Sequence, residues 1–275
     1  MNQERKAELK KQAKEVRKGI VTAVHSAKSG HPGGSLSAAD ILTYLYFEEM
    51  NIDPQNPKKA DRDRLVLSKG HIAPALYSVL SHRGYFPTSD LTTLRHTGSY
   101  LQGHPDMKHI PGVDMSSGSL GQGLSAAVGM ALNAKLDNSD YRVYAVCGDG
   151  EIQEGQIWEA AMFAASRKLD NLTVFVDNNN LQIDGPIDQV CSPYPIDEKF
   201  AAFGFHVINI DGHNFDEIEA AVNEAKATKG QPTAIIAKTV KGKGVSFMEN
   251  QCGWHGKAPN DEEFEQALKD LEVTE

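Results

Sequence analysis

The feature that most constrains the fold is a regular alternation of strand-like and helix-like segments in the second half of the chain. Helices are expected at 152–168 and 215–228. Short apolar runs rich in β-branched residues predict strands at 141–147, 172–177, 205–210 and 233–238. Such alternation is typical of parallel sheets, so we predict an α/β fold with helices on both faces of a parallel sheet.

The first half of the chain is predicted to be mainly helical. One amphipathic helix is expected over 4–28, with a stripe of Leu9, Ala13, Val16 and Ile20. A second is expected from Ala38 to Met50, with Ser37 as its N-cap. Further along we expect a strand at 64–68 and helices at 74–83 and 124–136.

We find no convincing linker before about residue 249. We therefore predict one α/β domain over 1–248 and a C-terminal loop with a helical tail over 249–275. The tail spaces four apolar residues as one face of a helix, either a docking stripe or a surface helix: Phe264, Ala267, Leu268 and Leu271.

Composition excludes several classes of protein. The 275 residues carry a net charge of −9 without a basic block, which disfavours nucleic-acid partners. No apolar run is long enough for a membrane span, and the charged N-terminus does not resemble a signal peptide, so we expect a cytoplasmic protein. The three cysteines form no CxxC pair and indicate neither a disulfide framework nor a zinc site.

Polar residues follow two consecutive predicted strands. Asp149 lies in a Gly-Asp-Gly turn after the strand at 141–147, and Asn179 follows the next strand, 30 positions later. If these strands are neighbours, both side chains stand at the edge of the sheet where ligands bind. Together with the backbone carbonyl of Leu181, they would give Mg²⁺ three oxygen ligands, and a diphosphate and water would complete its shell. Gly148 and Gly150 would let the backbone approach that diphosphate.

Other phosphate-binding loops fit less well. A dinucleotide fingerprint would need glycine at position 153, where the chain has Gln153, and no GxxxxGK[ST] motif occurs. A lone Gly-Asp-Gly is ordinary turn chemistry. Its pairing with an asparagine cluster at the next strand end is more specific.

This pairing is the thiamine diphosphate motif, and around it the sequence resembles the transketolase family. The resemblance covers nearly the whole chain through SGHPGG (29–34), LSKGH (67–71), GHPD (103–106), GSLGQG (118–123), GDGEIQEGQIWEA (148–160), KLDNL (168–172), DGH (211–213) and WHGKAP (254–259). It implies the thiamine diphosphate-binding fold, with thiamine diphosphate and Mg²⁺ as cofactors and Ca²⁺ or Mn²⁺ able to substitute. The implied reaction transfers a two-carbon ketol unit from a ketose phosphate to an aldose phosphate in the pentose phosphate network.

Four histidines match active-site histidines of the family. His31 and His104 resemble residues that contact the donor sugar, His71 one beside the cofactor, and His255 one bridging diphosphate and substrate. Each alone would also suit a satisfied interior imidazole or a capped turn. Three of the four follow glycine and two precede proline, in loops where functional side chains concentrate.

The resemblance also implies roles for four other residues. Gly118 and Leu120 would meet the aminopyrimidine of the cofactor through their backbone, although a glycine turn opening a helix looks the same. Glu154 would contribute to catalysis and cofactor binding as a relay between the two sites of a dimer, or is simply a first-turn carboxylate. Lys257 would reach the diphosphate, or is a solvated surface charge.

Members of the family continue beyond the point matched by His255, into a domain that supplies the glutamate that activates the cofactor. We therefore expect the N-terminal subunit of a split transketolase, active only with a C-terminal partner subunit in an α₂β₂ assembly. Related chemistry on other sugars and deoxyxylulose phosphate synthesis remain alternatives. A non-catalytic thiamine diphosphate-binding module is a third, although such a module would not need His31 and His104.

Overall fold

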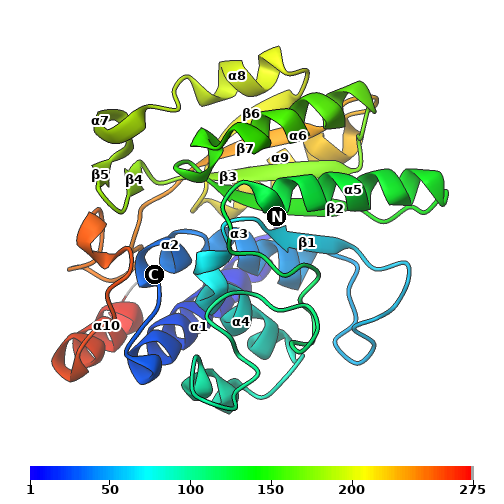
Figure 1. Ribbon diagram of the computed structural model, residues 1–275. Helices are drawn as coiled ribbons and strands as arrows, with labels where there is room; N and C mark the ends of the chain where they lie inside the picture. The colour runs from blue at the N-terminus through cyan, green and yellow to red at the C-terminus, as the bar shows by residue number, and fades with distance from the viewer. Residues whose placement is uncertain (274–275) are drawn as a thin grey trace.

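Five parallel strands form the central sheet of the computed structural model, which describes residues 1–273 (Figure 1). Their order across the sheet is β1-β2-β3-β7-β6, and every neighbouring pair is parallel. The bounds are β1 Arg64–Leu67, β2 Val143–Gly148, β3 Leu172–Asn178, β6 His206–Asp211 and β7 Thr233–Lys238. The predicted parallel sheet is confirmed, and no strand end differs from its prediction by more than two residues.

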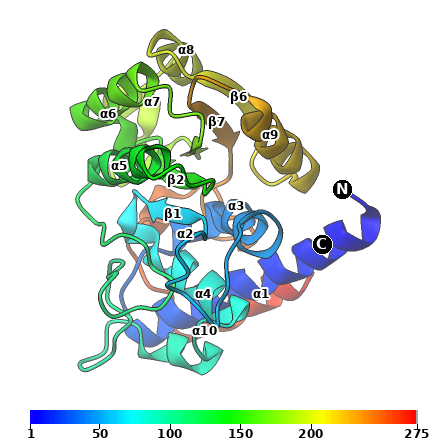
Figure 2. The ribbon, with the colours of Figure 1, turned by 90° about the vertical axis from the view of Figure 1, so that its right-hand side faces the viewer.

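Side chains alternate along each strand between two apolar clusters, one on each face. On β2, Tyr144 and Val146 join the first cluster, whereas Val143, Ala145 and Cys147 join the second. The first cluster includes α1 (Gln3–Ala27), α3 (Ala39–Tyr44), α4 (Ala73–Arg83) and α9 (Phe215–Ala227), and the second α5 (Gln122–Leu136), α6 (Gly155–Ser166) and α8 (Ile196–Ala202). Both faces are therefore covered, as predicted (Figure 2). Within the described residues, no helix is long and apolar enough to cross a bilayer.

The predicted helix from Ala38 to Met50 is confirmed as α3 continued by a π-helical turn (Leu45–Glu49), but the predicted cap is wrong. A further short helix, α2 (Pro32–Ser37), precedes it. Ser37 does not cap a helix: it lies inside α2, and its hydroxyl donates to the carboxylate of Asp177. Pro32 at the first position favours an earlier helix start, because its missing N–H costs nothing there.

The segment after β2 also differs from its prediction of one helix over 152–168. A 3₁₀ turn (Glu151–Gln153) comes first, and α6 begins only at Gly155 because Glu154 is extended. After β3, a short hairpin of β4 (Leu181–Gln182) and β5 (Gly185–Pro186) leads to α7 (Ile187–Cys191), none of which we predicted. This hairpin borders the predicted cofactor site.

The predicted helical tail forms α10 (Asp261–Val273), and its apolar stripe is a docking stripe. Ala267 and Leu271 are buried in the first cluster, and the Phe264 ring stacks on His25 of α1 with centroids 4.1 Å apart. α10 lies alongside α1 (Figures 1 and 2). The last two residues of the predicted tail lie outside the described residues.

Candidate active site

The Gly-Asp-Gly corner and the asparagine cluster lie at the carboxyl ends of adjacent strands. Gly148 of β2 is in register with Asp177 of β3, so Asp149 and Asn179 follow neighbouring strands as predicted. The Asp149 carboxylate accepts a 2.6 Å hydrogen bond from the backbone N–H of Asn180. The two strand ends are thus joined at the edge where parallel sheets bind ligands.

Asp149 is a buried carboxylate whose nearest cations, Lys69 and Lys241, do not pair with it directly. It is 2% exposed and accepts hydrogen bonds from the backbone N–H groups of Gly150 (2.8 Å) and Asn180 (2.6 Å). No ion pair is formed by Asp149 within residues 1–273. Burial, and then the neighbouring Asp177, raise the pKa of Asp149 to about 6. A cation beside this carboxylate would offset both effects, so the site suits a metal ion.

The other two predicted metal ligands are neutral oxygens. Asn179 Oδ1 accepts a 3.2 Å hydrogen bond from the backbone N–H of Leu181, and the Leu181 carbonyl accepts one of 2.9 Å from Lys241 Nζ. The described residues contain no group of three or more His, Cys, Asp or Glu side chains that could hold a metal. The predicted set, with one carboxylate, an amide and a carbonyl, remains a prediction suited to a hard cation that keeps water or phosphate oxygens.

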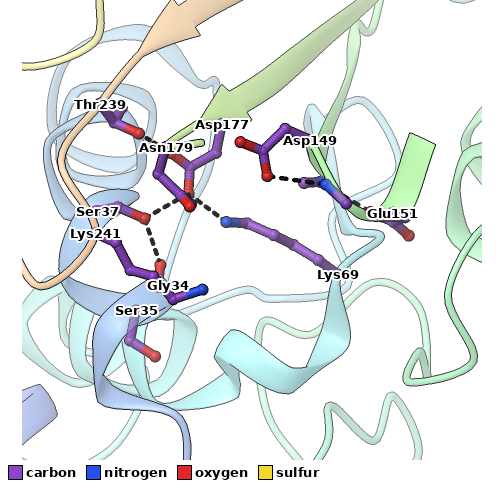
Figure 3. A network of polar contacts seen from close by, with 12 residues as sticks. Gly34, Ser35, Ser37, Lys69, Asp149, Glu151, Asp177, Asn179, Thr239 and Lys241 are labelled. Carbon is purple, nitrogen blue, oxygen red and sulfur yellow. Dashed lines mark hydrogen bonds and ion pairs between the residues drawn. The ribbon is translucent and has the colours of Figure 1, made fainter. Parts of the chain in front are cut away.

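Asp177 is the centre of a buried polar network beneath this corner (Figure 3). Its carboxylate is fully buried and accepts hydrogen bonds from Ser37 (2.5 Å), Thr239 and Lys69. Asn179 Nδ2 lies 3.4 Å from it. Burial alone would raise the pKa of Asp177, but the Lys69 ammonium and these hydrogen bonds hold it below its usual range. The network fixes the position of Lys69 at the base of the site.

Removing the Lys69 ammonium is expected to destabilise the protein, because Asp177 would keep a buried charge without its cation. For Lys69→Met we expect a loss of about 3 kcal/mol in the free energy of unfolding. Urea denaturation would measure it, with Lys58→Met at an exposed lysine as the control. A loss below about 1 kcal/mol would show that the pair does not support the fold.

Above the network lies a cavity of about 340 Å³, within the range of small-molecule sites. Its lining includes ten of the predicted site residues: His71, Gly118, Leu120, Gly148, Asp149, Gly150, Glu154, Asn179, Leu181 and His255. Leu120 and Glu154 are solvent-exposed. Residues drawn from motifs far apart in the sequence therefore surround one cavity.

Two of the predicted histidines, His71 and His255, line this cavity, and the ring of His31 lies against both. Their ring centroids lie 5.2 Å apart for His31 and His71, 5.4 Å for His31 and His255, and 5.2 Å for His71 and His255. Burial, and then Arg95, lower the pKa of His31 to about 4, whereas burial and Lys241 lower that of His255 to about 3. Burial also lowers the pKa of His71. The three rings are therefore neutral at pH 7 and available as hydrogen-bond acceptors and donors.

These lowered pKa values predict an acid-sensitive fold. Between pH 6.5 and 4 the unfolded histidines bind protons that the folded ones do not, so stability falls as the pH drops. We expect His31 and His255 each to contribute on the order of 1–2 kcal/mol to a loss between pH 7 and pH 5. Urea denaturation at both values would measure it. In the double variant His31→Asn/His255→Asn the loss should shrink, and an unchanged loss would refute the assignment.

The fourth histidine occupies an adjacent hollow. His104 lines a surface depression that shares Gly118 with the main cavity, and a Cβ on Gly118 would lie 3.0 Å from the His104 ring. Gly118 has φ +157°, so both its conformation and this close approach favour glycine. Burial and Arg95 lower the pKa of His104, as they do for His31.

Lys257 is not among the residues that line the cavity. Its ammonium pairs with Glu263 at 2.8 Å and lies 4.1 Å from the centre of the Trp254 ring. In this structure Lys257 is therefore a surface charge, and its contact with the diphosphate remains a prediction. The lysines in the lining are Lys69 and Lys241.

Sequence reasoning missed these two lysines. Lys69 belongs to the LSKGH motif, where only the histidine was singled out, and Lys241 lies just beyond the carboxyl end of β7. The strand-end rule that identified Asp149 would also have identified Lys241. Burial and Lys69 lower the pKa of Lys241 to about 8, and its Nζ lies 3.0 Å from His255 Nδ1.

Glu151 was also missed, although it joins three loops of the cavity. Its buried carboxylate accepts hydrogen bonds from Ser68 Oγ (2.6 Å) and from the backbone N–H groups of Gly121 and Gly148, both at 3.0 Å. Glu154, the predicted relay, is the N-cap residue of α6 and makes no side-chain capping bond. Glu151 therefore has the structural role, and Glu154 remains available to a ligand or partner.

The donor set suits a magnesium diphosphate. Two lysines offer positive charge to phosphate oxygens, and Asp149 offers negative charge to a metal. Among the buried polar atoms without a hydrogen-bond partner in the described chain, Gln182 Nε2 belongs to the cavity lining and His31 Nδ1 to the ring that contacts His71 and His255. Buried polar groups are normally paired, so the cavity is suited to a polar ligand.

Comparison with known proteins agrees with this chemistry. Residues 9–274 match the family model described as "Transketolase, thiamine diphosphate binding domain". The chain is 48% identical to a 6-deoxy-6-sulfo-D-fructose transketolase subunit of a Clostridium species, over 98% of each chain. It is 42% identical to an apulose-4-phosphate transketolase subunit of Phocaeicola vulgatus, over 96% of this chain and 93% of that one.

Longer relatives match over only part of their length. Human transketolase is 42% identical over 98% of this chain, which spans 43% of that protein. The crystal structure of transketolase from Campylobacter jejuni superposes with a TM-score of 0.92 at 36% identity, covering 99% of this chain and 43% of that one. Together with the family model, these matches show that this chain belongs to the transketolase family, in which it corresponds to the thiamine diphosphate-binding N-terminal subunits.

Proposed function

We propose that this protein is the N-terminal subunit of a thiamine diphosphate-dependent transketolase that moves a two-carbon ketol unit from a ketose phosphate to an aldose phosphate. The observation that carries the proposal is a cluster of three histidine rings: His71 and His255 line the cavity together with Asp149 and Asn179, and His31 contacts both rings. A thiamine diphosphate site alone would not need three mutually contacting neutral imidazoles. Bound thiamine diphosphate would supply the electron sink for carbon–carbon bond cleavage.

In this proposal, the charged residues of the site would bind the metal and the diphosphate, and the neutral histidines would bind the sugar. Asp149, Asn179 and the Leu181 carbonyl would hold Mg²⁺, while Lys69 and Lys241 would face the diphosphate. The neutral His31, His71 and His255, with His104 beside them, would hold sugar hydroxyls and move protons. The Asp177 network would keep Lys69 and Asn179 in place.

A partner chain completes this proposal. Transketolase relatives are more than twice as long as this chain, whereas the relatives that match its full length are named as subunits. The partner would provide the glutamate that activates the cofactor, in an α₂β₂ assembly. The exposed side chains of Leu120 and Glu154 beside the cavity are compatible with a partner closing over it.

The substrate has a specific alternative. The relative that is 48% identical is named for 6-deoxy-6-sulfo-D-fructose, and two others at 42% identity are named for apulose 4-phosphate. The same transfer on 6-deoxy-6-sulfo-D-fructose or on apulose 4-phosphate is therefore the second candidate. Retention of His31 and His104, which a cofactor-binding module would not need, supports a catalytic protein over a non-catalytic one.

Native purification of the tagged chain from its own host, followed by intact mass spectrometry, tests the partner proposal. We expect a second chain to elute with it, and ketol transfer to depend on both. Elution of this chain alone, with no fraction of the lysate restoring activity, would favour a binding module. Assaying the complex with xylulose 5-phosphate and with 6-deoxy-6-sulfo-D-fructose would separate the two substrate candidates.

A further inference from the structure

A second, smaller cavity lies away from the candidate active site. Its volume is about 80 Å³, enough for several water-sized groups but not for a nucleotide or a sugar ring with substituents. It is bordered by α1, by α10 alongside it (Figure 2), and by Lys243 of the loop after β7. Nothing in the proposed reaction uses it.

The lining of this cavity is strongly basic. Four cationic side chains and one carboxylate border it: Lys10, Lys14, Arg17, Lys243 and Asp40. The whole chain, by contrast, carries a net charge of −9. Such a local concentration of positive charge in an acidic protein favours an anion.

The acidic groups nearby do not neutralise all of this charge. Arg17 and Asp40 form a bidentate pair at 2.9 and 2.6 Å, and Glu249 lies 3.7 Å from Lys243. Lys14 Nζ donates to the backbone carbonyl of Glu272, which carries no charge. Lys10 forms no ion pair within residues 1–273. The Glu272 carboxylate, which pairs with Lys18, also lies near Lys14, so Lys10 is the cation of this cavity whose charge no carboxylate of the described residues balances.

A buried donor also lacks its partner. Arg17 is 7% exposed and lines the cavity, yet its Nε–H has no hydrogen-bond acceptor among the described residues. Its two terminal nitrogens are both used by Asp40. Buried N–H groups normally have a hydrogen-bond acceptor, so a ligand oxygen in the cavity would supply the acceptor that the Arg17 Nε–H lacks.

We propose that this cavity is a binding site for a tetrahedral oxyanion of phosphate size, held by Lys10, Lys14 and Lys243 with the Arg17 Nε–H as an additional donor. Oxyanions combine the charge and the multiple acceptor oxygens that such a donor set requires. Lys243 stands two residues from Lys241 of the catalytic cavity, so the loop after β7 would carry one cation for each site.

Isothermal titration of inorganic phosphate into the purified protein tests this site. The test variant is Lys10→Gln/Lys243→Gln, and the matched control is Lys58→Gln, which removes an exposed lysine elsewhere. Sodium chloride at equal ionic strength serves as the blank, because general screening would act on all surface charges. Phosphate binding needs no turnover, so the result is independent of the proposed reaction.

We expect saturable phosphate binding to the wild type and the control, and at least about tenfold weaker binding to the double variant. Titration with glycerol 3-phosphate distinguishes free phosphate from a phosphate ester as the ligand. If glycerol 3-phosphate binds more weakly than phosphate, the site is one for the free ion. If it binds equally or more tightly, the site is one for a phosphate ester. Equal phosphate affinity in the double variant and the wild type would overturn the proposal, because any binding would then lie at another site. Absence of saturable binding to the wild type would overturn it as well.

Discussion

Asp149→Ala is expected to abolish the magnesium-dependent binding of thiamine diphosphate. Asp149 is the carboxylate of the proposed metal site and lies 2% exposed beside the Leu181 hairpin. Without it, two neutral oxygens remain for the metal, and the diphosphate loses the cation that would neutralise it. We expect the affinity for the cofactor to fall at least about 100-fold in calorimetry with Mg²⁺ present.

The design of this experiment separates binding from folding. The N–H groups of Gly150 and Asn180 bond different oxygens of Asp149, so Asp149→Asn keeps an acceptor for only one of them while it removes the charge. Urea denaturation would confirm that this variant is folded, and the folded variant should still lose the metal. Asp140→Ala, at an exposed position, is the matched control. Unchanged cofactor affinity in the folded Asp149→Asn variant would refute the metal assignment.

His104→Ala is expected to leave cofactor binding intact while turnover falls by about 10²–10⁴-fold. The ring lies against Gly118 in the hollow adjacent to the main cavity, so its loss removes no proposed ligand of the metal or diphosphate. A residue that holds the sugar should affect kcat more than cofactor affinity.

The control for His104 is His109→Ala, five residues along the same loop and 69% exposed in its side chain. It should leave both cofactor affinity and kcat unchanged. Wild-type kinetics in His104→Ala would remove this histidine from the reaction. A parallel loss of cofactor affinity would instead assign it to the cofactor pocket.

The strand-helix alternation could be predicted from the sequence because β1, β2, β3 and β7 bury side chains on both faces and therefore form short apolar runs. Both predicted strand ends, at Asp149 and Asn179, occupy neighbouring positions because parallel strands align their carboxyl ends. The hydrophobic stripe of α10 was also readable, since Ala267 and Leu271 follow helical spacing.

The sequence could not reveal features decided by distant contacts. Ser37 lies inside α2, and its hydroxyl donates to Asp177, 140 positions away, so local capping preferences did not decide its place. Lys69 similarly depends on Asp177, 108 positions away. Lys257 faces Glu263 and Trp254 rather than the cavity, a choice between local partners that the WHGKAP motif does not specify.

The most direct test of the central proposal is ketol transfer by separately purified chains. Steady-state rates would be measured with thiamine diphosphate and Mg²⁺ for this chain, for the C-terminal chain that elutes with it, and for the two mixed. The split-enzyme account predicts turnover only in the mixture, with each chain alone at background. Turnover by this chain alone, or an inactive mixture that forms a stable complex with bound cofactor, would contradict it.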